Sequence, residues 1–396
     1  MSHPLFSPFK SRSVEFTNRI GVSPMCQYSS EDGFAADWHL VHLGARAQGG
    51  AGLVIVEASA VLPEGRITPA DLGIWKDAHI PALERIVRFL HEQGARAGIQ
   101  LAHAGRKGST LPPAKGTGVV LPCQGGWEPV APSAIPFDSD YAMPRALDQA
   151  GIDAVIEGFR QAARRALKAG FDLVEIHAAH GYLIHEFLSP LSNQRTDNYG
   201  GSFPNRVRLM LQVAEAVRAV WPESLPLFVR ISATDWADGG WTADESVELA
   251  RLLKKRGVDL IDTSSGALVP HAHIPVAPGY QVPLASRIRH EAQIATAAVG
   301  LITDPAQANS IIQNGDADLV LLAREMLRDP YWSVHSAAAL ADTATWPVQY
   351  LRAAPHLTTP PRAVPLSAPS ADATLQGPIA SVQAAAPAGT RRPRQK

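Results

Sequence analysis

The chain has 396 residues, of which 46% are hydrophobic and 18% charged, with a formal net charge of −1 and a pI near 6.9. This length and composition allow a large buried core, such as a single barrel domain of roughly 250 to 350 residues with insertions. A net charge near zero provides no field that would attract nucleic acid or an anionic membrane, so neither is expected as a partner.

The cysteine content and the absence of a long apolar stretch indicate the compartment. Only two cysteines occur, Cys26 and Cys123, and no stretch approaches the roughly 20 uninterrupted apolar residues of a membrane span. The first residues do not combine a basic segment with a long apolar one. We therefore expect a cytoplasmic protein with reduced thiols.

Short apolar runs recur along the chain, and each precedes a segment with helical periodicity, which is typical of parallel strands joined by crossover helices. Eight such units predict an α/β protein with a closed (β/α)8 barrel, the TIM barrel. The alternative is a doubly wound open sheet, but no Gly-x-Gly-x-x-Gly follows the first predicted strand. The predicted strands are 20–25, 53–58, 97–101, 173–176, 227–232, 260–264, 298–302 and 319–323.

Two helices carry clear boundary signals. Residues 149–169 place apolar side chains on one helical face, and Gly170 follows where a C-terminal cap belongs. Thr242 precedes a second helix, with Glu245 three residues later as in a capping box, and this helix is expected to end near Arg256.

Two further segments depart from the regular pattern. A proline-rich excursion from Gly105 to Asp148, between the third and fourth strands, is expected to form a lid or rim beside the pocket. After about Pro355 the composition shifts to Ala, Pro, Ser and Thr, which predicts a barrel domain at 1–355 and a disordered low-complexity tail at 356–396.

The run 174–190 contains the most informative residues. His177, His180 and Tyr182 leave the fourth predicted strand, at the barrel end where enzymes of this fold carry their chemistry. Two imidazoles can donate hydrogen bonds to one oxygen atom, and a nearby phenol can deliver a proton, so the run indicates a site for a carbonyl compound. The histidines alone would also fit a packed structural pair or two metal ligands.

The last two predicted strands end in Val299-Gly300 and Ala323-Arg324. Small residues let backbone amides approach an anion, and a phosphate site after strands seven and eight is common in this fold. Alternatively, Gly300 only completes a turn and Arg324 only pairs with an acidic neighbour.

Several ordered motifs occur along the chain. They are Ser23-Pro24-Met25-Cys26, the run 98–106 (GIQLAHAGR), His177-Ala178-Ala179-His180-Gly181-Tyr182-Leu183, the run 195–202 (RTDNYGGS) and Asn205-Arg206. Together these motifs resemble the flavin ene-reductases of the old yellow enzyme family, over about residues 6–352. Cys26, where yeast-type members carry threonine, resembles the bacterial subgroup that includes the xenobiotic reductases.

The resemblance implies noncovalent FMN, reduced by NADPH or NADH and reoxidised by an activated alkene. It implies that His177 and His180 hold the substrate's carbonyl or nitro oxygen, that hydride from flavin N5 reaches the β-carbon, and that Tyr182 protonates the α-carbon. Cys26 would modulate the flavin, and Tyr28 would contact the substrate. The implied FMN-binding residues are Ser23, Pro24, Met25, Cys26, Ala58, Gln100, Arg230, Val299, Gly300, Ala323 and Arg324.

The resemblance also implies a homodimer or homotetramer in which Arg352 reaches a neighbouring subunit's substrate site, although this chain continues well beyond that segment. Three rival functions are a metal-dependent barrel hydrolase, a noncatalytic flavin-binding module and a related demethylase or dienoyl-CoA reductase. The first lacks further ligands at other strand ends, and the second would need no positioned proton donor. The multidomain form of the third needs a four-cysteine cluster, which two cysteines cannot ligate.

Overall fold

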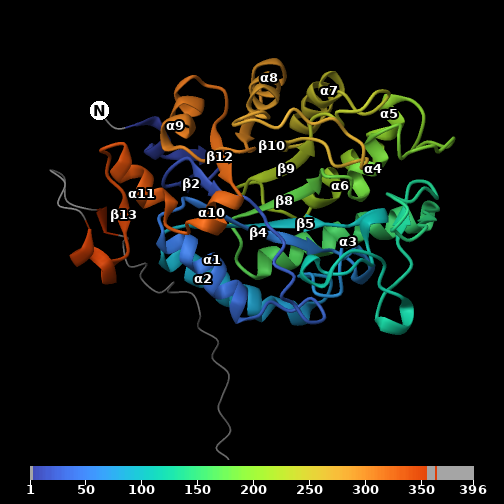
Figure 1. Cartoon of the computed structure of the whole chain (residues 1–396), viewed down its shortest axis with the longest axis horizontal. Helices are drawn as coiled ribbons and strands as arrows, with labels where there is room; N and C mark the ends of the chain where they lie inside the picture. Colours follow the sequence, from blue (N-terminus) through green and yellow to red (C-terminus); the bar gives the residue numbers. More distant parts are fainter. Residues whose placement is uncertain (1–2, 355–361, 364–396) are drawn as a thin grey trace, which may run out of the picture. The chain divides into compact units, whose positions relative to one another are not determined.

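The computed structural model describes residues 3–354 and 362–363. Its parallel strands close into a barrel in which each strand pairs with the next along the chain and the last pairs with the first (Figure 1). The predicted (β/α)8 barrel is confirmed, and the open sheet is wrong. The barrel strands are β3 (Ile20–Val22), β4 (Leu53–Ala60), β5 (Arg96–Ala102), β8 (Leu173–Ala178), β9 (Leu227–Ser232), β10 (Leu260–Ser264), β11 (Ala295–Ala298) and β12 (Leu319–Leu322).

Helices between the strands cover the outside of the barrel, as the figure shows for α1, α2 and α3 below it and α7 to α9 above it (Figure 1). The longer helices are α1 (Asp37–Gln48), α2 (Ile80–Glu92), α3 (Gln149–Lys168), α6 (Arg208–Arg218), α7 (Ala243–Lys254), α8 (Val282–Ala292), α9 (Pro305–Gln313) and α11 (Trp332–Ala339). Short helices are α4 (Leu183–Leu188), α5 (Phe203–Arg206) and α10 (Arg324–Arg328). None of the helices in the described part is both long and apolar enough to cross a bilayer.

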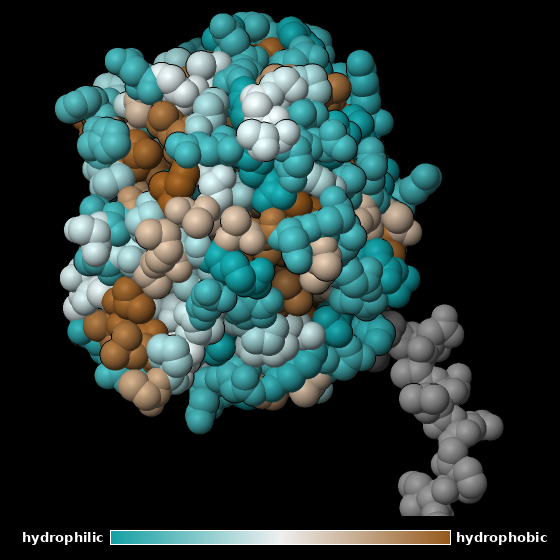
Figure 2. Space-filling model, turned by 90° about the vertical axis from the view of Figure 1, so that its right-hand side faces the viewer, coloured by the Kyte–Doolittle hydropathy of each residue, from teal (hydrophilic) through white to brown (hydrophobic). Residues whose placement is uncertain are grey.

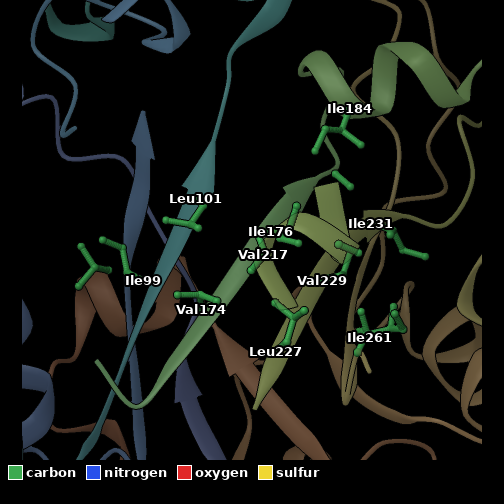
Figure 3. Close-up of a cluster of buried hydrophobic side chains, with 14 of the residues drawn as sticks. Ile99, Leu101, Val174, Ile176, Ile184, Val217, Leu227, Val229, Ile231 and Ile261 are labelled. Atoms are coloured by element: carbon green, nitrogen blue, oxygen red, sulfur yellow. The ribbon is translucent and has the colours of Figure 1, made fainter. Parts of the chain in front are cut away.

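Alternation along each strand divides the core into two clusters. Outward side chains such as Ile99, Val174 and Ile176 pack against the helices (Figure 3). Inward side chains fill the barrel at the end where its strands begin. There the hairpin of β1 (Phe9–Ser11) and β2 (Val14–Phe16) adds two more apolar residues. The inward cluster includes Val14, Phe16, Leu53, Ile55, Leu173, Phe228, Leu260, Leu319 and Leu321. The interior at the amino-terminal ends of the strands is therefore an apolar plug, which leaves the carboxyl-terminal end of the barrel for polar chemistry.

The seventh strand was predicted at the wrong place. It covers Ala295–Ala298, whereas 298–302 was expected. Gly300 has φ +117° and Leu301 has φ +51°, and neither value is compatible with an extended strand. The true strand consists of small residues, so its apolar signal was weaker than that of the turn that follows.

Other strand ends also differ from expectation. β4 continues to Ala60, and β5 covers Arg96–Ala102, one residue longer than predicted at each end. Three further differences lie next to predicted site residues. β3 stops at Val22 because Pro24 has no N–H to continue the ladder, so Ser23 to Met25 lie in a loop. β8 continues to Ala178, which places His177 within the strand. β12 stops at Leu322, since Ala323 has φ −102° and ψ −98°.

The boundary signals of the two helices are confirmed. α3 covers Gln149–Lys168, and Gly170 has φ +85° beyond its end. Thr242 and Glu245 form the reciprocal capping box of α7, although that helix ends at Lys254, before the expected end near Arg256.

The excursion after β5 contains mostly turns and loops, as expected. Its regular pieces are the 3-10 turns η4 (Gly105–Lys107), η5 (Pro113–Lys115) and η6 (Pro122–Gln124) and the short strands β6 (Val130–Ala131) and β7 (Arg145–Ala146). Elsewhere the chain forms η1 (Pro4–Phe6), η2 (Pro63–Gly65), η3 (Asp77–His79), η7 (Val348–Ala353), β13 (Thr345–Trp346) and β14 (Arg362–Ala363). The tail predicted at 356–396 lies outside the described residues except for β14.

Candidate active site

Polar side chains form layers above the apolar plug. In β8 the inward residues are Leu173, Glu175 and His177, so a carboxyl group lies one step below the first histidine. Its neighbour β9 aligns Arg230 with His177, and β10 aligns Asp262 with Arg230. The same alternation in β5 directs Gln100 inward, where it meets Glu175.

The three predicted catalytic rings meet at the mouth of the barrel. The ring centroid of His177 lies 5.2 Å from that of His180 and 5.0 Å from that of Tyr182, both in edge-to-face orientation. The Ala179 amide donates to His177 Nδ1 over 3.3 Å, which assigns the proton of the neutral ring to Nε2. Backbone groups therefore do not satisfy both histidines, as a purely structural pair would require. His177 keeps its Nε2–H free to donate to a further partner.

His180 lies in a strained turn that its surroundings maintain. Its φ is +59° and that of Gly181 is +69°, and a non-glycine residue in this region costs about 1 kcal/mol or more. Its amide donates to Ser232 Oγ over 2.9 Å, and Lys107 Nζ donates to its carbonyl over 2.8 Å. The Gly181 amide donates to His185 Nδ1 over 2.9 Å. These three bonds hold the turn that presents the His180 ring.

His180 has a side-chain partner that sequence reasoning missed. Its Nε2 lies 2.7 Å from Ser264 Oγ, at the end of β10. If the Ser264 hydroxyl donates this bond, Nδ1 of His180 carries the ring proton and can donate to a substrate. The arrangement is thus compatible with two imidazole donors facing one oxygen atom.

Burial keeps the three predicted catalytic groups electrically neutral. It lowers the pKa of His177 and of His180 well below the usual value, and the charge of Arg230 lowers both further. It raises the pKa of Tyr182 well above the usual value, so the phenol keeps its proton at neutral pH. The site therefore offers hydrogen-bond donors and one proton, without a fixed charge on the three rings.

Neutral buried histidines predict sensitivity to acid. Burial lowers the pKa of His42 to about 3 and that of His103 to about 4. Below pH 6.5 such histidines bind protons in the unfolded chain but not in the folded chain. The free energy of unfolding therefore falls as the pH drops from about 6.5 towards 4. We expect a loss of about 2 kcal/mol per buried histidine at pH 5 relative to pH 7.5.

The measurement is urea unfolding at both pH values, for the native chain and for His42→Gln. The His42 ring is 7% exposed and lies outside the three-ring group, so the substitution should reduce the acid-induced loss by about one histidine's share. An identical pH dependence in both proteins would contradict the prediction.

The loop after β3 is anchored by a buried acid. Glu57 Oε2 accepts the Gln27 amide over 2.6 Å, and its Oε1 lies 3.0 Å from His39 Nε2. Gln27 stands between Cys26 and Tyr28, and Tyr28 has φ +51°. Burial, with the negative charges of Asp71 and Glu57, raises the pKa of Cys26 well above the usual value, so its thiol stays protonated.

Two cavities meet the predicted site residues. One, of about 370 Å³, is lined by Tyr28, Tyr182, Lys107 and the excursion residues Leu111, Pro113, Gly116, Thr117, Gly118, Asp140 and Tyr141, which confirms the excursion as a rim. The other, of about 240 Å³, is lined by Ser23, Pro24, His180, Arg230, Val299, Gly300, Ala323 and Arg324. Small side chains line the space beside Tyr182, namely Ala58, Ala60, Ala102 and Ala104. Figure 2 looks onto the side that carries α4, α5 and this rim, where apolar patches lie between hydrophilic side chains.

The part of the second cavity lined by Gly300 and Arg324 suits an anion. A Cβ at Gly300 would lie 2.7 Å from the Gln281 side chain, and Gln281 Nε2 itself donates to the Val299 carbonyl over 3.0 Å. Arg328 pairs with Glu325, whereas exposed Arg324 has no acidic partner within residues 3–354. The alternative that Arg324 only serves a neighbouring acid is therefore not supported.

The sequence profile of the NADH:flavin oxidoreductase / NADH oxidase family matches residues 4–343. The chain belongs to this family. It is thus an oxidoreductase that uses FMN with a nicotinamide reductant, and the alternative of a metal-dependent barrel hydrolase is wrong.

Curated relatives and solved structures agree with this membership. The chain is 52% identical over 355 residues to the NADPH dehydrogenase of Halalkalibacterium halodurans, covering 89% of this chain and 99% of the relative. It is 49% identical over 354 residues to the NADPH dehydrogenase of Bacillus subtilis, with 89% and 99% covered. Morphinone reductase superposes with a TM-score of 0.72 at 28% identity, over 87% of this chain and 91% of that one. A 2-naphthoyl-CoA reductase in complex with 2-naphthoyl-CoA superposes with a TM-score of 0.77 at 25% identity, over 86% of this chain and 52% of that one. The resemblance to the old yellow enzyme family is confirmed.

The residues of this flavoenzyme's second cavity fit FMN. An anion fits beside Gly300 and unpaired Arg324, and the cavity continues to Arg230, whose cation suits the electron-rich end of a flavin ring. Four alanines keep the wall beside Tyr182 free of bulky side chains. The donor set therefore matches a flavin phosphate at one end and the ring at the other.

One predicted site residue lies apart from this site. Arg352 is exposed in η7 and lines neither cavity, so its contact with a neighbouring subunit stays a prediction. Cys123 is exposed on the excursion. Met25 is half-buried against the core, and Gln100 lies in the polar layer below the mouth.

Proposed function

We propose that this flavoenzyme reduces carbon–carbon double bonds activated by a carbonyl or nitro group. The observation that carries the proposal is the meeting of His177, His180 and Tyr182 at the barrel mouth, where Tyr182 lines one cavity and His180 lines the other. A barrel that only bound flavin would need no protonated phenol beside two neutral imidazoles.

FMN, when bound, supplies hydride from its N5 position to the β-carbon of such an alkene. The residues that would hold it are Ser23, Pro24, Met25, Cys26, Ala58, Gln100 and Arg230 around the ring and Val299, Gly300, Ala323 and Arg324 at the phosphate. NADPH is the expected reductant, since the curated relatives are named NADPH dehydrogenases.

The two histidines would bind the substrate's oxygen. His177 has a free Nε2–H, and Nδ1 of His180 supplies a second donor when the Ser264 hydroxyl donates to Nε2 of the same ring. Both rings are neutral, so they polarise the carbonyl by hydrogen bonding and stabilise the negative charge that develops on the oxygen. This withdrawal of electrons makes the β-carbon electrophilic.

Tyr182 would then protonate the α-carbon. The phenol lines the substrate cavity beside the His177 ring, and its raised pKa keeps the proton available throughout the neutral range. A carbanion-like carbon is a strong enough base to take a proton from a phenol. Tyr28 lines the same cavity and would contact the rest of the substrate.

The proposed activity can be tested on the purified protein. We expect a yellow solution that oxidises NADPH under anaerobic conditions when cyclohexenone, a maleimide or a nitroalkene is added. Flavin without turnover of any of these alkenes would contradict the proposal and favour a binding role. A colourless protein that does not bind added FMN would contradict the placement of the cofactor as well.

Replacing Cys26 with alanine tests the loop after β3. The thiol is half-buried and protonated, and Gln27, the next residue, is tied to Glu57. We expect Cys26→Ala to retain FMN but to change the flavin reduction potential and the KM for the alkene. Cys123→Ala, on the exposed rim, is the matched control and should change neither. A Cys26 variant with native potential and kinetics would show that the thiol only fills space.

A further inference from the structure

Four polar side chains form a closed layer inside the barrel, between the apolar plug and His177. Glu175 and Asp262 are 0% exposed, Gln100 2% and Arg230 4%. Gln100 Nε2 donates to Glu175 Oε1 over 2.8 Å. Arg230 Nε lies 3.0 Å from Asp262 Oδ2, and its Nη2 donates to Ser23 Oγ over 3.0 Å.

The charges of this layer do not balance if both acids are ionised. Two carboxylates would face one guanidinium, and an uncompensated buried carboxylate costs several kcal/mol. Among the described residues, Glu175 Oε2 and Asp262 Oδ1 have no hydrogen-bond donor. The two carboxyl groups contact each other, so a single proton between them would satisfy both.

We propose that Glu175 is a protonated acid in the working enzyme and donates its hydrogen bond to Asp262, which remains the counter-ion of Arg230. Glu175 is thus a positioning residue, because it acts on the flavin only through its neighbours. The inference depends on the proposed placement of Gln100 and Arg230 beside the flavin ring.

Burial and charge place the proton on Glu175. Burial raises the pKa of Glu175 well above the usual value, and the negative charge of Asp262 raises it further, which together outweigh the opposing effects of Arg230 and of the Gln100 hydrogen bond. Burial also raises the pKa of Asp262, but Arg230 opposes this shift. Two further groups near the pair are neutral, namely Gln100 from β5 and His177 from β8.

The shared proton has a consequence for flavin chemistry. With Glu175 neutral, the layer has no net charge, whereas an ionised Glu175 would make it negative. Reduction adds negative charge to a flavin, and a negative layer beneath it would oppose that step. The proton therefore favours the reduced cofactor.

Glu175→Gln gives a direct test in the FMN-loaded enzyme, because the amide has the shape and the donor of a protonated acid. Infrared spectroscopy at neutral pH should show the carbonyl band of a buried carboxylic acid in the native protein and its loss in E175Q. The ratio of the dissociation constants for oxidised and reduced FMN should change by less than about threefold. Loss of an ionised carboxylate would change it by about tenfold or more, equivalent to about 1.4 kcal/mol.

A matched control separates this acid from another one. Glu186 is also buried, with its pKa raised to about 8 by burial, so it contributes its own acid band at neutral pH. Glu186→Gln should remove that band and leave the one lost in E175Q. If E175Q leaves the acid bands unchanged, or changes the FMN affinity ratio by about tenfold or more, the proposal is overturned.

Asp262→Asn keeps the proposal testable if E175Q does not fold. Without Asp262, Glu175 becomes the only possible counter-ion of Arg230 in the layer and should ionise, so the same acid band should disappear. An unchanged band would overturn the proposal. The infrared measurement needs no alkene, so failure of the proposed function would appear as absent turnover with the band intact.

Discussion

Tyr182→Phe is expected to slow alkene reduction by about 10²–10⁴-fold, while reduction of the flavin by NADPH keeps its native rate. The substitution removes the phenolic proton and leaves the ring that packs edge-to-face on His177. In the proposed mechanism only the step that protonates the α-carbon needs this hydroxyl, because the imidazoles would bind the substrate's oxygen. Stopped-flow measurement of each half-reaction separates the two effects.

The matched control is Tyr141→Phe. Tyr141 lines the same cavity, but it comes from the excursion and lies outside the three-ring group. Its variant should keep both rates within a few-fold of the native enzyme. A Tyr182→Phe enzyme that reduces alkenes at the native rate would assign the proton to another donor, and Lys107 in the same cavity would be the next residue to test.

His177→Gln is expected to lower kcat/KM for an enone by about 10²–10³-fold, as removal of one donor from an oxyanion site does. The buried imidazole directs Nε2–H to the mouth because the Ala179 amide occupies Nδ1. A glutamine side chain has more rotational freedom and is not held by this bond. Since burial keeps the pKa of His177 well below the usual value, the native profile of kcat/KM against pH should show no limb near 6.5.

His91→Gln provides the control for a histidine outside the site. Its ring is 34% exposed and contacts Asp172, away from the mouth residues. Kinetics should be unchanged in this variant, and FMN content should be native in both. A His177 variant with native kcat/KM, or a native profile with a limb near 6.5, would contradict the proposed role of the neutral imidazole.

Local patterns were sufficient for most of the barrel. Apolar runs such as 227–232 and 260–264 coincide with β9 and β10, because buried strands need unbroken apolar outer faces. Gly170 and the Thr242–Glu245 pair marked helix ends, since caps depend on neighbouring backbone groups alone. The seventh strand was missed because its Ala and Thr side chains carry little hydrophobic signal.

Residue identity and order along the chain also determined the catalytic candidates, since His177, His180 and Tyr182 lie within six residues at the end of one strand. The partners of these residues depend on the closed barrel instead. Ser264 beside His180, Lys107 on the His180 carbonyl and Asp262 beside Glu175 join positions that are about 70 to 90 residues apart. No local pattern encodes such contacts, because they arise only when neighbouring strands align in register and exclude water, and that same exclusion sets the protonation of the groups.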